Sequence, residues 1–251
     1  MITTQEVPLA FDEAAPSYDT MVARNPGYHA HLRAAADALL DVLPTADPTS
    51  AAPARLVDLG CGSGASTSAL LAGARRSGRR LDITGVDASA GMLAEARAKA
   101  WPAGVRFEHG LAQELGARRA GWGLAEPVDG VLAAYLFRNV TERDEVLRDV
   151  HDLLAPGGVL VVQEYSVAGS RPADLVWSLV CWLVVIPLSW LTSRQTRLYR
   201  YLWRSVRRFD SVQVFVDRLY RMGFEDVEVR TAPGWQRGIL HTFRARTPVA
   251  R

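Results

Sequence analysis

The chain has 251 residues, of which 49% are hydrophobic and 22% charged, the composition of a globular protein that can bury a sizeable core. A net charge of only +2 argues against a general nucleic-acid binder. Cys61 and Cys181 lie far apart, which excludes a disulfide framework, and neither they nor the five histidines have the spacing of a metal site.

The first 53 residues predict a helical arm, residues 8–43, and a linker rich in Pro, Thr, Ser and Ala, residues 44–53. The opening residues lack the basic-then-apolar pattern of a signal peptide. We therefore expect a cytoplasmic protein.

From residue 54 onward, strand-like and helix-like segments alternate. The predicted strands are residues 55–59, 81–86, 105–108, 128–135 and 159–164. The predicted helices are residues 66–74, 91–100 and 143–154, the last of them ended by Pro156-Gly157-Gly158. This alternation predicts βαβ units and an α/β fold with a doubly wound, mostly parallel sheet.

Residues 175–191 read LVWSLVCWLVVIPLSWL, an uncharged run near the lower length limit of a membrane span. A span would separate strands that must pair in one sheet, so we expect a helical lid followed by a basic helix, residues 194–208. Two roles stay open for the run. It is either a buried lid or homodimer contact, or a peripheral contact with the inner face of the cell membrane through its tryptophans and flanking arginines.

The chain closes with a predicted helix, residues 211–222, and two strands, residues 227–230 and 240–245, which would finish the sheet as an antiparallel edge pair. We expect one domain over residues 1–251. Its parts are an N-terminal arm and linker (1–53), a cofactor-binding core (54–166), a helical lid (167–210) and a C-terminal completion of the sheet (211–251).

A glycine loop follows the first strand of the core, with Gly60, Gly62 and Gly64. Such a loop turns tightly and lets a ligand approach the backbone, but dinucleotide folds use a similar one. Asp58 favours a ligand with an ammonium group over a pyrophosphate, and S-adenosyl-L-methionine has that group. Asp87 ends the second strand, where an acid can accept hydrogen bonds from both ribose hydroxyls. The plainer alternatives are a cap or ion pair for Asp58 and a helix N-cap for Asp87.

These residues resemble motif I and the acid after strand two of class I methyltransferases. Several further segments resemble the ubiquinone/menaquinone biosynthesis C-methyltransferases over roughly residues 11–246. These segments are Phe11-Asp12 with Ser17-Tyr18-Asp19, residues 135–140 (YLFRNV), residues 154–158 (LAPGG), residues 163–166 (QEYS), residues 199–209 (YRYLWRSVRRF) and residues 222–224 (MGF).

The resemblance implies S-adenosyl-L-methionine as the cofactor and a small lipophilic acceptor, with methyl transfer to carbon. We place the cofactor against Asp58, Gly60, Cys61, Gly62, Gly64, Asp87, Ala88, Met92, Leu111, Ala112, Tyr135 and Tyr18. Leu111 departs from the family, which has an acid that reads adenine there, so that contact must come from elsewhere, for example Gln113.

Arg138 and Asn139 follow the fourth predicted strand, at the sheet edge where ligands bind. Our hypothesis is that Arg138 stabilises a phenolate or orders a water that acts as base, and that Asn139 positions the acceptor or the methionine tail. The alternative pairs Arg138 with Glu142 or Asp144 and makes Asn139 a helix cap. Tyr199, Trp177 and Trp182 are the candidate acceptor contacts, with core packing as the alternative for the tyrosine.

Two other functions remain open. One is a methyltransferase of specialised metabolism that acts on oxygen, nitrogen or carbon of a phenol, polyketide or carotenoid; Leu111 and the apolar lid favour keeping it. The other is a cofactor-binding partner protein without catalysis, against which the intact glycines and acids argue.

Overall fold

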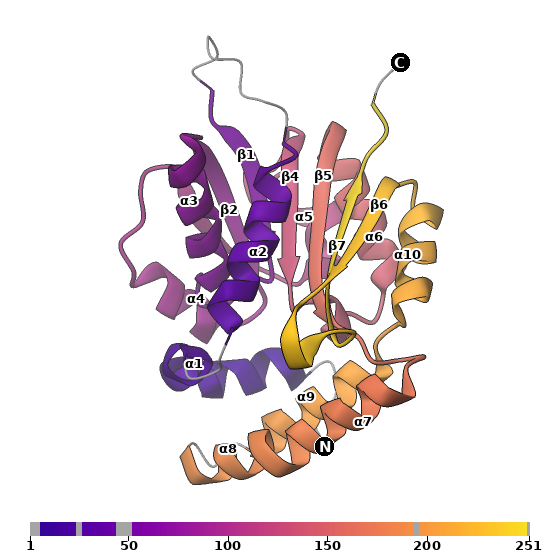
Figure 1. Cartoon of the computed structure of the whole chain (residues 1–251). Coiled ribbons are helices and arrows are strands. Elements are labelled where there is room, and N and C mark those ends of the chain that lie inside the picture. The colour runs from indigo at the N-terminus through magenta and orange to yellow at the C-terminus, as the bar shows by residue number, and fades with distance from the viewer. Residues whose placement is uncertain (1–5, 24–26, 44–51, 193–195, 250–251) are drawn as a thin grey trace.

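A computed structural model describes residues 6–23, 27–43, 52–192 and 196–249. Its centre is a seven-stranded sheet in the order β3-β2-β1-β4-β5-β7-β6 (Figure 1). The strands are β1 (Ala54–Leu59), β2 (Leu81–Asp87), β3 (Val105–His109), β4 (Val128–Ala134), β5 (Leu154–Tyr165), β6 (Glu225–Thr231) and β7 (Leu240–Arg246). Strands β1 to β5 pair in parallel, whereas β7 is antiparallel to β5 and to β6. The predicted doubly wound sheet with an antiparallel edge pair is therefore confirmed.

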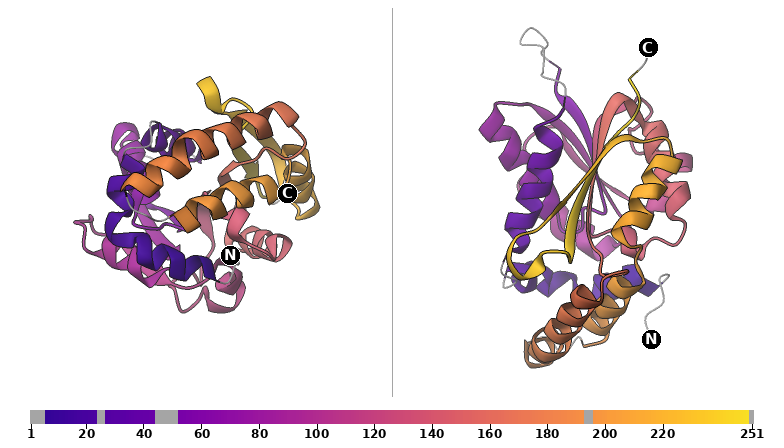
Figure 2. Two further views of the ribbon diagram at one scale, coloured as in Figure 1. Left: turned by 90° about the horizontal axis from the view of Figure 1, so that it is seen from below. Right: turned by 45° about the vertical axis from the view of Figure 1, so that its right-hand side comes forward.

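Alternate apolar side chains of the central strands build a core on each face of the sheet. On one face Leu56 packs with Leu39 and Leu70. On the other, Val57 and Leu59 join the core that the following helices cover. The first face carries α2 (Tyr28–Leu40) and α3 (Ala65–Ser77), and the second carries α5 (Leu115–Arg118), α6 (Arg143–Leu153) and α10 (Val212–Arg221) (Figure 2). Burial on both faces explains why the strands read as continuous apolar runs.

The turn after α6 differs from the prediction. Helix α6 ends at Leu153, within one residue of the predicted end before Pro156-Gly157-Gly158, but β5 begins at Leu154 and not at the predicted residue 159. Leu154 pairs with Val128, and the register shifts before the next strand contact. The proline and glycines therefore lie in an irregular first part of β5.

Four helices lie at the carboxyl ends of the parallel strands (Figures 1 and 2). They are α1 (Val7–Ala23), α7 (Arg171–Val180), α8 (Ile186–Thr192) and α9 (Thr196–Arg208). A π-helical turn, Cys181–Val185, joins α7 to α8 just before Pro187. Proline cannot donate a backbone hydrogen bond, and a local π turn is one way for a helix to absorb that loss. The apolar run is thus a bent helix over the sheet edge, and in the part of the chain that the structure describes no helix is long and apolar enough to cross a bilayer.

Candidate active site

The glycine loop between β1 and α3 adopts a backbone that only glycine accepts easily. Gly60, Gly62 and Gly64 have φ values of 78°, 53° and 88°. A Cβ atom on Gly60 would lie 3.1 Å from the side chain of Leu136, and one on Gly64 would lie 2.7 Å from the ring of Trp101. Because these glycines have no side chains, the loop can pack closely against Leu136 and Trp101.

Asp58 lies beneath this loop and is fully buried. Its Oδ2 accepts hydrogen bonds from the hydroxyls of Ser66 (2.7 Å) and Thr67 (2.6 Å), at the start of α3. Its Oδ1 has no hydrogen-bond partner among the described residues. Burial raises the pKa of Asp58 from 3.8 to about 6, against the lowering effect of the two hydroxyls. A buried carboxylate with one unsatisfied oxygen is the kind of group that a nearby cation stabilises.

The carboxylate of Asp87, at the end of β2, is hydrogen-bonded to two backbone segments. Its Oδ2 accepts from the amide of Gly62 and its Oδ1 from the amide of Ser89, both at 2.8 Å. Burial raises the pKa of this carboxyl, while the amide hydrogen bonds oppose the rise. Each oxygen keeps a second lone pair, so contact with ribose hydroxyls stays a prediction compatible with these bonds.

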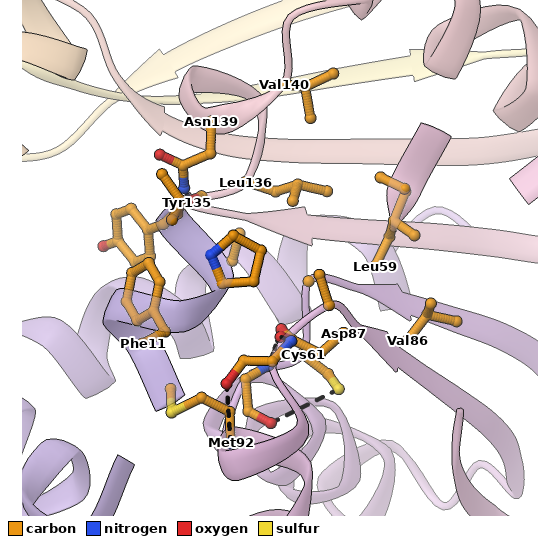
Figure 3. Close-up of a pocket in the computed structure, with 18 of the residues that line it drawn as sticks. Phe11, Leu59, Cys61, Val86, Asp87, Met92, Tyr135, Leu136, Asn139 and Val140 are labelled. Carbon is orange, nitrogen blue, oxygen red and sulfur yellow. Dashed lines mark hydrogen bonds between the residues drawn. The ribbon is translucent and has the colours of Figure 1, made fainter. Parts of the chain in front are cut away.

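A cavity of about 590 Å³ opens above the loop at the carboxyl end of the sheet. Figure 3 shows Cys61, Asp87 and Met92 on one side of it and Phe11 beside Tyr135 on another. Its size falls within the range of small-molecule sites. The predicted residues that line it are Gly60, Cys61, Gly62, Asp87, Ala88, Met92, Leu111, Ala112, Tyr135, Arg138 and Asn139.

Helix α1 forms a wall of the cavity through Val7, Pro8 and Phe11. Two acids attach it to the core, Asp12 to the segment after β2 and Asp19 to the glycine loop. Asp12 accepts from the hydroxyl of Ser89 (2.6 Å) and the amide of Gly91 (2.8 Å). Asp19 accepts from the hydroxyl of Ser63 and from Nζ of Lys99 (2.6 Å), and the same Nζ donates to the carbonyl of Ser63 (2.6 Å). The only lysine of the chain therefore fixes the arm to the loop.

Arg138, which also lines the cavity, makes a buried ion pair. Its Nη1 lies 2.7 Å from Oε1 of Glu164, and the side chains are 9% and 0% exposed. The same Nη1 donates to the carbonyl of Tyr135 (2.7 Å). The expected alternative partners, Glu142 and Asp144, are thus replaced by Glu164 on β5, which is adjacent to β4 in the sheet.

Asn139 joins the lid to the site. Its Oδ1 accepts from the hydroxyl of Tyr201 on α9 (3.0 Å), and its Nδ2 donates to the carbonyl of Tyr135 (3.4 Å). The residue that precedes α6 is Glu142, so Asn139 is not the helix cap that the alternative proposed. Tyr201 of the lid thus reaches the candidate catalytic pair.

Tyr135 is the centre of an aromatic stack. Its ring stacks on Tyr28 (centroids 5.6 Å apart) and on Tyr165 (5.2 Å), and Tyr165 contacts Trp177 (5.1 Å). Tyr135 has a φ of 61°, which is strained for a side chain of this size. The stacked rings hold the backbone of Tyr135 in this conformation. The carbonyl of Tyr135 accepts hydrogen bonds from both Arg138 and Asn139.

Five further predicted residues, Asp58, Gly64, Trp177, Trp182 and Tyr199, are not among those that line the cavity. Asp58 lies beneath the loop, and Gly64 contacts Trp101 on its far side. Trp177 is buried in the core that joins the lid to the sheet, whereas Trp182 is 43% exposed. Tyr199, on α9, is half-buried and does not line the cavity. The side chain of Tyr18 is outside the described part of the structure.

Together, the sheet order, the glycine loop and the acids at the ends of β1 and β2 define a class I methyltransferase fold. Residues 2–242 match the ubiE/COQ5 methyltransferase family. The chain therefore belongs to that family, which confirms the predicted family, fold class and cofactor, S-adenosyl-L-methionine.

Two relatives and one solved structure illustrate this similarity. The chain is 32% identical over 174 residues to the ubiquinone/menaquinone biosynthesis C-methyltransferase of Rubrivivax gelatinosus, a match that covers 68% of this chain but only 63% of that relative. It is 32% identical over 219 residues to the demethylmenaquinone methyltransferase of Thermus thermophilus, covering 85% and 90% of the two chains. The plantazolicin methyltransferase BpumL, solved with S-adenosylhomocysteine, has a TM-score of 0.62 at 14% identity, with 96% of each chain covered, and shares the fold.

Three contacts of the site could not be paired from the sequence. Glu164, Lys99 and Tyr201 reach the site from segments that are distant in sequence from their partners, so spacing alone could not pair them. The Phe11-Asp12 and Ser17-Tyr18-Asp19 segments resemble the family, which indicates a role for α1 but does not give the contacts of its acids.

Proposed function

We propose that this chain is an S-adenosyl-L-methionine-dependent methyltransferase that methylates a ring carbon of a small, lipophilic, quinol-type acceptor. The observation that carries the proposal is the make-up of the cavity, which joins the glycine loop to a wall of aromatic and apolar side chains. The names of the two relatives describe a C-methyltransferase of quinone biosynthesis and a demethylmenaquinone methyltransferase. Both names refer to a quinone-type acceptor, which supports the proposal.

The polar end of the cavity fits the cofactor. Oδ1 of Asp58 is buried and has no hydrogen-bond partner among the described residues, and its negative charge would favour an ammonium group bound nearby. Asp58 does not line the cavity, but Ser66 does, and its hydroxyl donates to Asp58. Ser66 or a water would therefore transmit the effect of this carboxylate. Asp87 and the glycine amides would hold the adenosine part.

When bound, the cofactor supplies a methyl group on a positively charged sulfur, which keeps the bonding electron pair as the methyl leaves. The chain must then align a ring carbon with that methyl group and exclude water. Phe11 and Leu136 offer flat and apolar contacts for a ring. The new bond joins the methyl to the ring carbon, and the proton on that carbon passes to a water molecule, which restores the aromatic ring.

Arg138 is the group best placed to assist the acceptor. It lines the cavity, and Glu164 fixes its orientation. Its positive charge favours the phenolate form of a quinol, which makes the ring carbon more nucleophilic. Because Glu164 balances that charge, we assign Arg138 the role of an oriented donor. Asn139, which is hydrogen-bonded to Tyr201, positions the acceptor beneath the lid.

The test is methyl transfer from S-adenosyl-L-methionine with a labelled methyl group. Demethylmenaquinol, menaquinol and catechol are compared as acceptors, and the products are identified by mass spectrometry. We expect label on a ring carbon of demethylmenaquinol and none on menaquinol, whose reactive carbon already carries a methyl group. Label on a catechol oxygen but not on demethylmenaquinol would contradict the proposal.

One observation favours a second candidate. Leu111 lines the cavity and is 43% exposed, at the position where the family has an acid. This departure, with the apolar lid, supports a methyltransferase of specialised metabolism with a phenol or polyketide acceptor. The catechol arm of the same experiment detects that activity.

A further inference from the structure

The bent helix formed by α7, the π turn and α8 has two contrasting faces. Its inner face packs on the sheet through Ala173, Trp177 and Cys181, all of them buried. Its outer face, here called the outer lid face, exposes Leu175 (61%), Leu179 (48%), Trp182 (43%), Leu183 (70%), Val184 (55%) and Trp190 (65%). Leu179 follows Leu175 by four residues, and Trp182 and Leu183 follow Leu179 by three and four. This spacing places these side chains along one side of the helix.

This exposure is concentrated in one place. Among the described residues, 14 large hydrophobic side chains are exposed, and seven of them lie between Leu175 and Trp190. Single exposed apolar residues are normal, whereas a contiguous apolar patch marks a contact surface. The outer lid face is therefore a candidate contact surface for an apolar partner.

Positive charge accompanies this surface. Residues 167–210 contain seven arginines and two aspartates, a net charge of +5, so the rest of the chain carries −3. Helix α9 has five arginines and no acid, and Arg197 and Arg200 on it are exposed. The guanidinium of Arg200 lies over the ring of Trp182, 5.6 Å from its centroid. Cationic groups therefore border the apolar side chains directly.

We propose that the outer lid face docks on an anionic lipid bilayer, with α7 and α8 lying in the plane of the membrane interface. A helix of this kind buries leucines at the acyl boundary, places tryptophan at the level of the headgroups and sets arginines against anionic lipids. A second copy of this chain would bring the same positive charges together, which disfavours it as the partner.

Helix α9 connects the outer lid face to the active site. Trp182 contacts Trp203 on α9 (centroids 5.5 Å apart), and Tyr201 on the same helix bonds to Asn139. A docked lid would therefore place the mouth of the site next to the phase in which a lipophilic acceptor dissolves. The proposal itself depends on the surface alone and not on the identity of the acceptor.

The test is co-sedimentation of the full chain, without cofactor or acceptor, with vesicles of phosphatidylcholine alone or mixed with an equal amount of phosphatidylglycerol. We expect binding to the mixed vesicles that weakens as salt is added. Leu179→Glu with Leu183→Glu should weaken binding more than about tenfold. Arg197→Gln with Arg200→Gln should weaken it about tenfold.

Matched controls change the same residue types elsewhere. Val214→Glu with Val249→Glu alters two exposed apolar side chains, and Arg221→Gln with Arg237→Gln removes two exposed charges. Both controls should bind vesicles as the wild type does, and circular dichroism checks that every variant is folded. Three results would overturn the proposal: no binding to mixed vesicles, equal loss in the controls, or a dimer in solution that Leu179→Glu with Leu183→Glu converts to a monomer without any vesicle binding.

Discussion

At the residue scale, Asp58 combines complete burial with one oxygen that no described residue satisfies. The sequence predicts its importance because an acid two residues before a glycine loop is a recognisable pattern. Its place beneath the loop, with Ser66 between it and the cavity, follows from the turn of the chain into α3 and could not be read from spacing.

The raised pKa of Asp58 predicts a pH-dependent affinity for S-adenosylhomocysteine, which carries the same ammonium group as the cofactor. With a pKa of about 6, the carboxylate is mostly ionised at pH 7 and mostly protonated at pH 5. We expect the affinity to fall about tenfold from pH 7 to pH 5. Calorimetry measures it, and Asp58→Asn should bind weakly with little pH dependence. An equal pH response in both proteins would contradict this role.

The same pKa has an effect of opposite sign on the unliganded fold. The folded value lies above the unfolded one, so this contribution to stability is present below pH 4 and is lost as the pH rises through about 6. The loss attributable to Asp58 is on the order of 3 kcal/mol. Urea unfolding at both ends of this range should therefore show a smaller pH response in Asp58→Asn than in the wild type.

The buried pair between Arg138 and Glu164 predicts a large effect on stability. Glu164→Gln leaves a nearly buried guanidinium without its counter-charge, and we expect a loss of about 3 kcal/mol in the free energy of unfolding. The matched control is Asp174→Asn, which breaks the exposed pair with Arg207 and should lose at most about 1 kcal/mol. Urea denaturation measures the free energy of unfolding of both variants. Similar losses would show that the buried ion pair stabilises the fold no more than the exposed one does.

At the element scale, the strands and most helices could be predicted, because hydrophobic periodicity and glycine or proline boundaries report local structure. The π turn before Pro187 and the early start of β5 could not, because both depend on contacts with neighbouring elements. The attachment of α1 to the cofactor loop was also missed, since Asp19 and Lys99 are 80 residues apart.

The attachment of α1 predicts a role for Lys99 in cofactor affinity. Lys99→Met removes its bonds to Asp19 and to the carbonyl of Ser63, which loosens a wall of the cavity. We expect the Kd for S-adenosylhomocysteine to rise about fivefold, or about 1 kcal/mol. Arg76→Met breaks a similarly exposed pair with Asp37 (2.5 Å) away from the cavity and should leave the Kd unchanged. Equal affinity in wild type and Lys99→Met would rule out this role.

At the scale of the whole molecule, we propose that the arm, core, lid and C-terminal strands unfold as one unit. Residues 204 apart in sequence are joined where Arg246 donates to the carbonyl of Val42 (2.8 Å). The lid core includes Tyr165 from β5 and Leu240 from β7. Each part of the predicted domain therefore shares buried contacts with another.

This proposal predicts a single unfolding transition. Tryptophan fluorescence, which reports on Trp122 in the core and Trp177 in the lid, should coincide with far-ultraviolet circular dichroism. S-adenosylhomocysteine at 100 times its Kd should shift both signals together by about 2.7 kcal/mol. Two separated transitions would instead indicate a lid that unfolds independently.

The two ends of the lid meet, because the hydroxyl of Ser166 donates to the carbonyl of Asp210 (2.7 Å). The 43 residues between them therefore form an excursion that begins and ends at neighbouring points beside the sheet. During evolution such a segment can change while the sheet and the glycine loop stay the same. Proteins that share the sheet and the loop can thereby acquire new acceptors through changes in a single stretch of the gene.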